Sequence, residues 1–182
     1  MLNNWVVMPT CLPTVLRRCH TCTSERFRPN GKFRVNAHHK LLDAWLLALC
    51  TTCGDTARLT LLERVNVRSV RPELLDRMRD NDPVLAAKLL QDPVVRRRNR
   101  IALDWDNAWR LDTVGSDHLD REVIDVSVRF AARIPVRPVR LIAEGCGLPR
   151  AEVERLLAEG KLVSAVRLSG KLSGDFTFLL KC

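Results

Sequence analysis

Apolar and polar residues alternate along three neighbouring segments in the first third of the chain. Phe33 and Val35 lie between polar residues, and Leu59 and Leu61 share one face. A period of two is typical of a half-buried strand. The intervening segment is apolar enough to be a strand, although its length and composition also permit a helix. We therefore predict three strands, within GKFRVNA, LLDAWLLALC and TARLTLLERV.

After Val70 the apolar spacing changes to that of helices. The segment RPELLDRMRD opens with Pro72 and repeats apolar residues on one face. Asp82–Pro83 and Asp92–Pro93 each place aspartate before proline. Aspartate caps a helix N-terminus, and proline suits the first helical position. The sequence therefore predicts three short helices, beginning at Pro72, Pro83 and Pro93.

The last part of the chain predicts two long strands followed by two helices. IALDWDNAWRLD (101–112) and EVIDVSVRF (122–130) both alternate cleanly, and a turn lies between them. This arrangement predicts a long antiparallel hairpin. From Pro138 onward, two apolar stripes at helical spacing flank GCGLP, and a short strand pair follows.

Composition and charge indicate a soluble protein with a polyanionic partner. The 182 residues are 46% apolar and 28% charged, and the formal net charge is +9. No secretory signal or run of about 18 apolar residues is present, so we expect a cytoplasmic protein. Residues 1–66 carry nine Lys/Arg against four Asp/Glu, residues 67–120 carry ten against ten, and residues 121–182 carry eleven against seven. Two basic ends on either side of a neutral middle favour a polyanionic binding partner. The alternative is that the arginines are simply solvated on the surface.

Two pairs of cysteines have the spacing of a metal site. Cys19 and Cys22 form one C-x-x-C pair, and Cys50 and Cys53 form the second. Two intervening residues let one tight turn present both thiolates to one ion, and Gly54 eases the second turn. Structural zinc takes four such ligands in a tetrahedron. We predict a structural Zn²⁺ site of the zinc-ribbon type.

The cysteine spacing also permits three other interpretations. A redox pair would begin a helix in a β-α-β unit, and neither pair has that setting. Disulfides fit a reducing compartment and an odd total of seven cysteines poorly. An iron site uses a similar cysteine spacing, and metal analysis of the purified protein would distinguish iron from zinc. The arginines beside the first pair either contact phosphate or offset the anionic thiolates; these are Arg17, Arg18, Arg26 and Arg28.

The C-terminal stretch resembles the alpha-L RNA-binding motif of ribosomal protein S-four type. The resemblance covers about 45 residues and is carried by Arg140-Leu141, Ala143-Glu144, Leu148 to Val153, Leu156-Leu157, Gly160 to Val163 and Gly174-Asp175-Phe176. The chain departs from the motif at three places: Ile142 replaces an aspartate, Pro149 replaces a serine, and the hairpin is shortened to Ser169-Gly170.

That resemblance implies contacts with folded RNA. The contacts would be made by Arg140, Arg150, Arg155 and Lys161. The alternative is a plain helix pair whose arginines bridge to Glu144 and Glu154 at i,i+4 spacing. Each such pair is worth only a few tenths of a kcal/mol.

The whole chain also resembles an uncharacterised bacterial family, the domain of unknown function numbered ten sixty-two. The resemblance is carried by Trp5-Val-Val with Pro9, by Arg18-Cys19 and by the segments KFRVNA, LLDAWLL and CTTCG. It supports a zinc ribbon joined to an alpha-L module and implies no activity.

These observations predict an α+β protein in three parts. They are a zinc ribbon at 1–66, a helical connector with a long β-hairpin at 67–135, and an alpha-L-like helix pair with short strands at 136–182. The predicted function is non-enzymatic binding of structured RNA, such as ribosomal or transfer RNA. No membrane is expected as a partner. A protein-interaction adaptor and a DNA-binding regulator are the alternatives. No nucleophile motif, phosphate-binding glycine loop or dinucleotide fingerprint indicates an enzyme.

Overall fold

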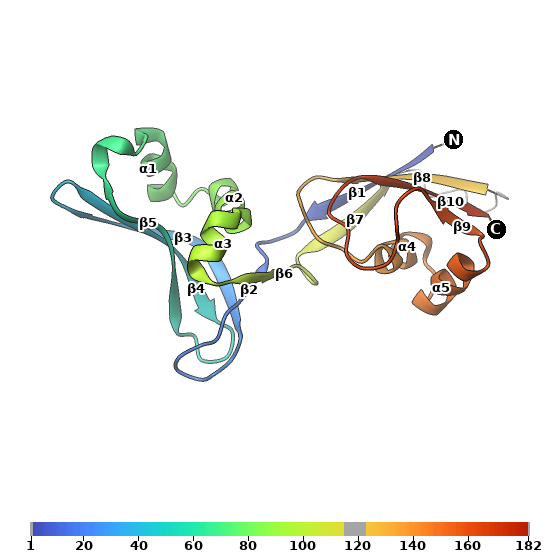
Figure 1. Cartoon of the computed structure of the whole chain (residues 1–182), viewed down its shortest axis with the longest axis horizontal. Coiled ribbons are helices and arrows are strands. Elements are labelled where there is room, and N and C mark those ends of the chain that lie inside the picture. Colours follow the sequence, from blue (N-terminus) through green and yellow to red (C-terminus); the bar gives the residue numbers. More distant parts are fainter. Residues whose placement is uncertain (1, 115–122, 182) are drawn as a thin grey trace. The chain divides into compact units, whose positions relative to one another are not determined.

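The computed structural model describes residues 2–114 and 123–181 and divides the chain into two compact units. The central unit is residues 12–104, and the terminal unit combines residues 1–11 with 105–182. Each unit has its own five-stranded sheet (Figure 1). The protein is therefore a mixed α and β protein, as predicted.

The sheet of the central unit is antiparallel, in the order β5-β4-β3-β2-β6. Its strands are β2 (Thr14–Leu16), β3 (Arg26–His38), β4 (Leu41–Cys50), β5 (Thr56–Asn66) and β6 (Ala102–Asp104). The predicted strand pattern is confirmed: alternate residues of β4 are buried, and Leu59 and Leu61 of β5 face the core together. The ambiguous apolar segment is thus a strand.

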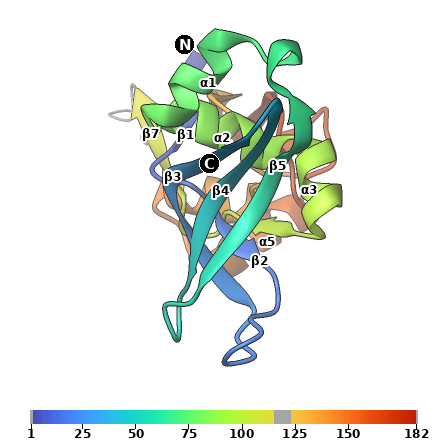
Figure 2. The same cartoon turned by 90° about the vertical axis from the view of Figure 1, so that its left-hand side faces the viewer.

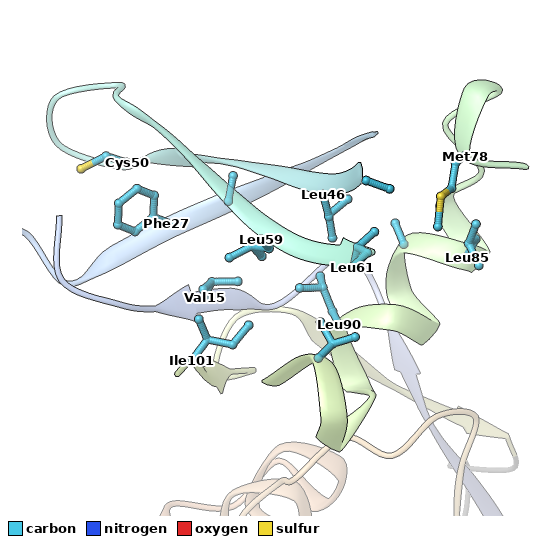
Figure 3. Close-up of a cluster of buried hydrophobic side chains, with 14 of the residues drawn as sticks. Val15, Phe27, Leu46, Cys50, Leu59, Leu61, Met78, Leu85, Leu90 and Ile101 are labelled. Carbon is cyan, nitrogen blue, oxygen red and sulfur yellow. The ribbon is translucent and has the colours of Figure 1, made fainter. Parts of the chain in front are cut away.

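Three helices provide the other half of the core in the central unit. They follow the 3₁₀ turn η1 (Val67–Ser69) and are α1 (Pro72–Arg79), α2 (Pro83–Gln91) and α3 (Pro93–Asn99). Met78, Leu85 and Leu90 of the helices pack in one cluster with Leu46 and Leu59 of the strands (Figure 3). The helices and the sheet therefore share one hydrophobic core, and neither can bury its apolar face alone.

Aspartate caps start α2 and α3 as the sequence predicts. The Asp82 carboxylate accepts hydrogen bonds from the N–H groups of Val84 and Leu85, at 2.8 and 3.1 Å. Asp92 accepts one from Val94 N–H at 2.7 Å. Each carboxylate thus satisfies donors that the first turn leaves unpaired.

Asp82 also gives the central unit a pH-dependent contribution. Arg77 Nε lies 2.6 Å from its carboxylate, and this hydrogen bond, with that from Leu85 N–H, lowers the pKa of Asp82. The stabilisation is present above the ordinary aspartate pKa of about 3.9 and is lost as pH falls through the lower folded value.

Two substitutions of Asp82 should distinguish the stability due to its helix cap from that due to its negative charge. We expect Asp82→Ala to lower Tm at pH 7 by roughly 4–8 °C, because cap and ion pair are both lost. Asp82→Asn retains a capping oxygen, so its Tm should fall less than that of Asp82→Ala. Calorimetry at several pH values should show the difference between wild type and Asp82→Asn shrinking below about pH 4. Equal Tm values for Asp82→Ala and wild type would contradict the role given to this cap.

The sheet of the terminal unit is mixed, in the order β7-β1-β8-β10-β9. Its strands are β1 (Leu2–Pro9), β7 (Trp109–Val114), β8 (Val123–Phe130), β9 (Leu162–Ser164) and β10 (Phe176–Lys181). β1 pairs antiparallel with β7 and parallel with β8. The predicted terminal strand pair is confirmed, because β10 pairs antiparallel with β9.

The prediction of a long hairpin from 101–112 and 122–130 is wrong. β1 lies between β7 and β8, so these two strands are not neighbours. The first segment is also divided, because β6 belongs to the central unit and β7 to the terminal unit. Alternation predicts a strand but not its neighbour, and the apolar N-terminal strand takes the place that a hairpin partner would occupy.

Two helices pack within the terminal unit: α4 (Pro138–Cys146) and α5 (Arg150–Ala158). α4 ends at Gly147, whose φ of 66° is the left-handed conformation that terminates many helices. Ile142 and Val153 are fully buried, one on each helix, which confirms the predicted helices and their apolar faces. A specific alpha-L arrangement is not established by these contacts.

The observed units differ from the predicted three-part division. The predicted boundaries after residues 66 and 135 fall inside the central and terminal units, because helices α1–α3 share a core with the cysteine-bearing strands and β1 joins the C-terminal sheet. The two observed units therefore divide the charged residues differently from the three predicted parts. The central unit carries 18 Lys/Arg against 10 Asp/Glu, and the terminal unit carries 12 against 11.

Within residues 2–114 and 123–181, no helix has the length and apolar character needed to cross a membrane.

Candidate metal centre and basic pockets

The four predicted cysteine ligands lie together at one end of the central sheet. Cys19 and Cys22 belong to the loop between β2 and β3, whereas Cys50 ends β4 and Cys53 lies in the turn before β5. Figure 2 shows these two connections at the same end of the sheet. All four sulfur atoms lie within 4.8 Å of one another. Antiparallel pairing of β3 with β4 thus brings together two local turns that are distant in sequence.

Short hydrogen bonds hold the two cysteine turns in place. Cys19 N–H donates to Ser24 C=O at 2.7 Å, and Gly54 N–H donates to Cys50 C=O at 3.0 Å. Gly54 has φ of 75°, which glycine adopts without strain. The Thr21 hydroxyl donates to the Asp55 carboxylate at 3.1 Å and joins one turn to the other. These bonds therefore hold the backbone of both turns from which the four cysteine side chains extend.

The thiols influence one another's ionisation. N–H groups of Cys53 and Thr52 hydrogen-bond to Cys50 and lower its pKa to about 6. Asp55 N–H favours ionisation of Cys53, but partial desolvation of its sulfur and the hydrogen bonds with the other three cysteines outweigh it and raise the pKa of Cys53 to about 12. The Cys50 thiolate thus forms readily, whereas ionisation of Cys53 would be favoured by a bound cation.

The cluster fits a tetrahedral metal ion. Metal–sulfur bonds of about 2.3 Å place tetrahedral ligands about 3.8 Å apart. The Cys19–Cys53 and Cys22–Cys50 sulfur pairs are 3.7 and 3.5 Å apart. These separations are much longer than the roughly 2.05 Å of a disulfide bond. Cys19 and Cys50 are buried, whereas Cys53 is exposed at the surface of the unit.

A basic cavity of about 330 Å³ lies beside the cysteine cluster. It is lined by Arg17, Arg18, His20, Phe27, Asp55, Thr56, Ala57 and Arg58. Two of the four arginines that flank the first cysteine pair therefore face a common space. A third, Arg26, instead forms an ion pair with Asp104 at 2.6 Å.

A second basic cavity, which we call the arginine pocket, lies in the terminal unit and has a volume of about 480 Å³. Its lining residues are Arg137, Val139, Arg140, Arg150, Glu154, Leu157, Arg167, Leu168, Ser169 and Gly170. They come from the beginning of α4, from α5 and from the loop between β9 and β10. Among the described residues, its lining therefore includes four arginines and one glutamate.

The structure separates the four predicted RNA-contacting residues into two pairs. Arg140 and Arg150 line the arginine pocket. Arg155 instead lies 2.6 Å from Glu152, whose hydrogen bond raises the pKa of Arg155, and Lys161 lies 3.1 Å from Glu159. The charges of this second pair are thus largely compensated locally.

Two arginines of the pocket were not among the predicted contacts. Arg137 precedes α4 by one residue, and its position at a helix start was a signal that could have been used. Arg167 comes from an irregular loop, which gives no periodic signal. The i,i+4 bridges of the plain helix pair do not form: within the described residues, Arg137, Arg140, Arg150 and Arg167 make no ion pair with any carboxylate.

The surroundings of these arginines favour an anion. The Arg140 guanidinium stacks over Trp109, with 5.2 Å between its central carbon and the ring centroid. Arg137 and Arg150 stand at the N-termini of α4 and α5, where the helix dipole already has its positive end. Cations there are electrostatically unfavourable, and the four arginines that line the cavity carry like charges. A bound anion would relieve both effects.

Comparison with known families gives one match. The family model described as "Protein of unknown function (DUF1062)" matches residues 35–168, which is well over half of the chain. Neither the curated proteins nor the solved structures include a match to this chain. The matched region spans most of the central unit and the helices of the arginine pocket.

Proposed function

The chain belongs to the DUF1062 family, and from its sites we propose that it is a non-enzymatic, zinc-containing protein that binds structured RNA. Residues of the arginine pocket would contact RNA phosphates, and the cysteine cluster would hold a structural zinc ion. The description of the family assigns no activity to its members.

The cysteine cluster supports zinc in a structural role. Cys19, Cys22, Cys50 and Cys53 would supply four thiolates, a donor set typical of structural zinc. Such a site leaves no coordination position for a substrate or a reactive water molecule. The ion would stabilise the two turns of the central unit, and the protein would carry out no metal-dependent reaction.

The observation that carries the RNA proposal is the arginine pocket. Arginine binds phosphate through paired N–H donors, and Arg140 and Arg150 in the lining are two of the four residues that the alpha-L resemblance assigns to RNA. The central unit adds a broader basic surface, with 18 cations against 10 acidic residues and a cavity beside the cysteines. A specific pocket and a general positive field together suit folded RNA, which proteins recognise largely through its backbone and shape.

We place this activity in the cytoplasm, with ribosomal or transfer RNA as the target class. Crosslinking the tagged protein to RNA in cells, followed by sequencing, would identify the target. A protein adaptor would instead retain its partners after nuclease treatment. A DNA-binding regulator would prefer duplex DNA over an RNA of matching sequence.

Neutralising Arg150 is expected to weaken RNA binding. We expect Arg150→Gln to reduce affinity for a 5′-phosphorylated RNA hairpin about tenfold, the size of one lost charge-assisted contact. Wild-type affinity should also fall steeply between about 50 and 200 mM salt, because binding releases counterions from phosphate. Fluorescence anisotropy with an internally labelled RNA measures both effects.

The matched control is Arg155→Gln, which makes the same charge change on the same helix. Arg155 is already bridged to Glu152 and Glu159, so its loss should change affinity less than twofold. The RNA proposal fails if wild type shows no salt-sensitive binding, or if Arg150→Gln binds as wild type does.

A further inference from the structure

The arginine pocket concentrates positive charge at one place in a unit that is otherwise nearly neutral. Four other cations of the unit, Arg110, Arg155, Lys161 and Lys171, are each paired with a carboxylate. A binding surface for a long polyanion would present a stripe of cations along the strand path. Four unbridged arginines at one cavity instead suit a compact group with more than one negative charge, either in a free small molecule or at the end of a strand.

The cavity is larger than a phosphate group requires, and part of its wall is apolar. Its volume of about 480 Å³ falls in the range of about 300–1,000 Å³ found for small-molecule sites. Val139 and Leu157 are half-buried, and Leu168 is buried. These side chains provide contact area for a ribose or a nucleobase next to the charged groups.

We propose that the arginine pocket binds a nucleoside phosphomonoester, either the phosphorylated end of an RNA strand or a free mononucleotide. The RNA source rests on the proposed function above, whereas the mononucleotide does not. A phosphomonoester carries about −1.5 to −2 charges at pH 7 and three terminal oxygens. An internal phosphodiester carries a single charge and two such oxygens.

The number of arginines matches this ligand. Three terminal oxygens accept several guanidinium hydrogen bonds at once, and the second negative charge offsets the mutual repulsion of the arginines. Arg140 is held over Trp109, so less conformational freedom is lost when it binds. Glu154 is the one carboxylate among the described residues of the lining and leaves them with a net positive charge.

Three small ligands test the chemistry of the pocket by isothermal titration calorimetry on the full-length protein. AMP should bind at least tenfold more tightly than 3′,5′-cyclic AMP, which has the same nucleoside but a phosphodiester. Adenosine should show no measurable binding. Arg167→Gln, in an exposed loop, should weaken AMP binding about tenfold, and Arg155→Gln should leave it within twofold. Equal binding of AMP and cyclic AMP would overturn the inference, as would an equal loss in both variants.

RNA hairpins that differ only at their ends identify the source. Hairpins with a 5′-phosphate, a 3′-phosphate or only hydroxyl ends are compared by anisotropy. A preference of about tenfold for one phosphorylated end, abolished by Arg167→Gln, supports the RNA end. Binding of AMP without binding of any hairpin supports the free nucleotide and overturns the RNA proposal. Equal binding of all three hairpins without AMP binding overturns the present inference and leaves the RNA proposal intact.

Discussion

Replacing Cys53 with serine is expected to remove the metal ion and destabilise the central unit. Cys53 is exposed, and a surface substitution without a special role usually changes stability by less than about 0.5 kcal/mol. As a zinc ligand, it would instead contribute through metal binding, which adds about 4 kcal/mol when free metal exceeds its Kd a thousandfold. An effect of several kcal/mol from an exposed thiol would therefore identify a ligand.

Two measurements check this expectation. Native mass spectrometry should find one zinc ion per wild-type chain and much lower occupancy in Cys53→Ser, and the same metal analysis distinguishes zinc from iron. Hydrogen exchange should show faster exchange in β3, β4 and β5 of the variant and after chelation of wild type. The terminal strands β8 and β10 should be unaffected.

The control is Cys11→Ser, the same chemical change at an exposed cysteine in the terminal unit. It should retain the metal and the stability of wild type. A purified wild-type chain without metal would refute the zinc assignment, and so would a Cys53→Ser variant that keeps full occupancy.

Local features of the fold could be predicted because they depend on neighbouring residues. The Asp-Pro dipeptides predicted the starts of α2 and α3, and each aspartate does cap its helix. The cysteine spacing predicted that each pair lies in a tight turn. It also predicted that the two pairs form one cluster. Both inferences use geometry that only a few adjacent residues determine.

Long-range pairing could not be predicted in the same way. β1 joins β7 and β8 across about one hundred residues of chain, and its parallel register with β8 has no local signal. The arginine pocket was predicted in part for the same reason. Arg140 and Arg150 belong to one helical motif, whereas Arg167 reaches the pocket from a loop. The alpha-L resemblance assigned Arg155 to RNA, and its ion pair with Glu152 was missed, although their i,i+3 spacing on one helix was the signal that could have predicted it.

Replacing Gly145 with alanine is expected to destabilise the terminal unit. In an ordinary helix interior this change is favourable by about 1 kcal/mol, because glycine is a poor helix former. At Gly145 an added Cβ would lie 2.4 Å from Cη2 of Trp5 and 2.5 Å from Cζ3. Trp5 is buried and packs edge-to-face on Phe178, with 5.4 Å between ring centroids. Since the ring has no free space to enter, the strain of about 1–3 kcal/mol should exceed the helical gain.

A double-mutant cycle with Trp5→Phe tests this explanation. Phenylalanine lacks the outer part of the indole that approaches Gly145, so the Gly145→Ala change should become neutral or stabilising in that background. Guanidinium unfolding, with hydrogen exchange of β8 and β10 as the local readout, gives the four free energies. We expect a coupling of at least about 1 kcal/mol between the two sites. Additive effects would mean that the close approach of α4 to Trp5 does not determine why glycine is required at this position.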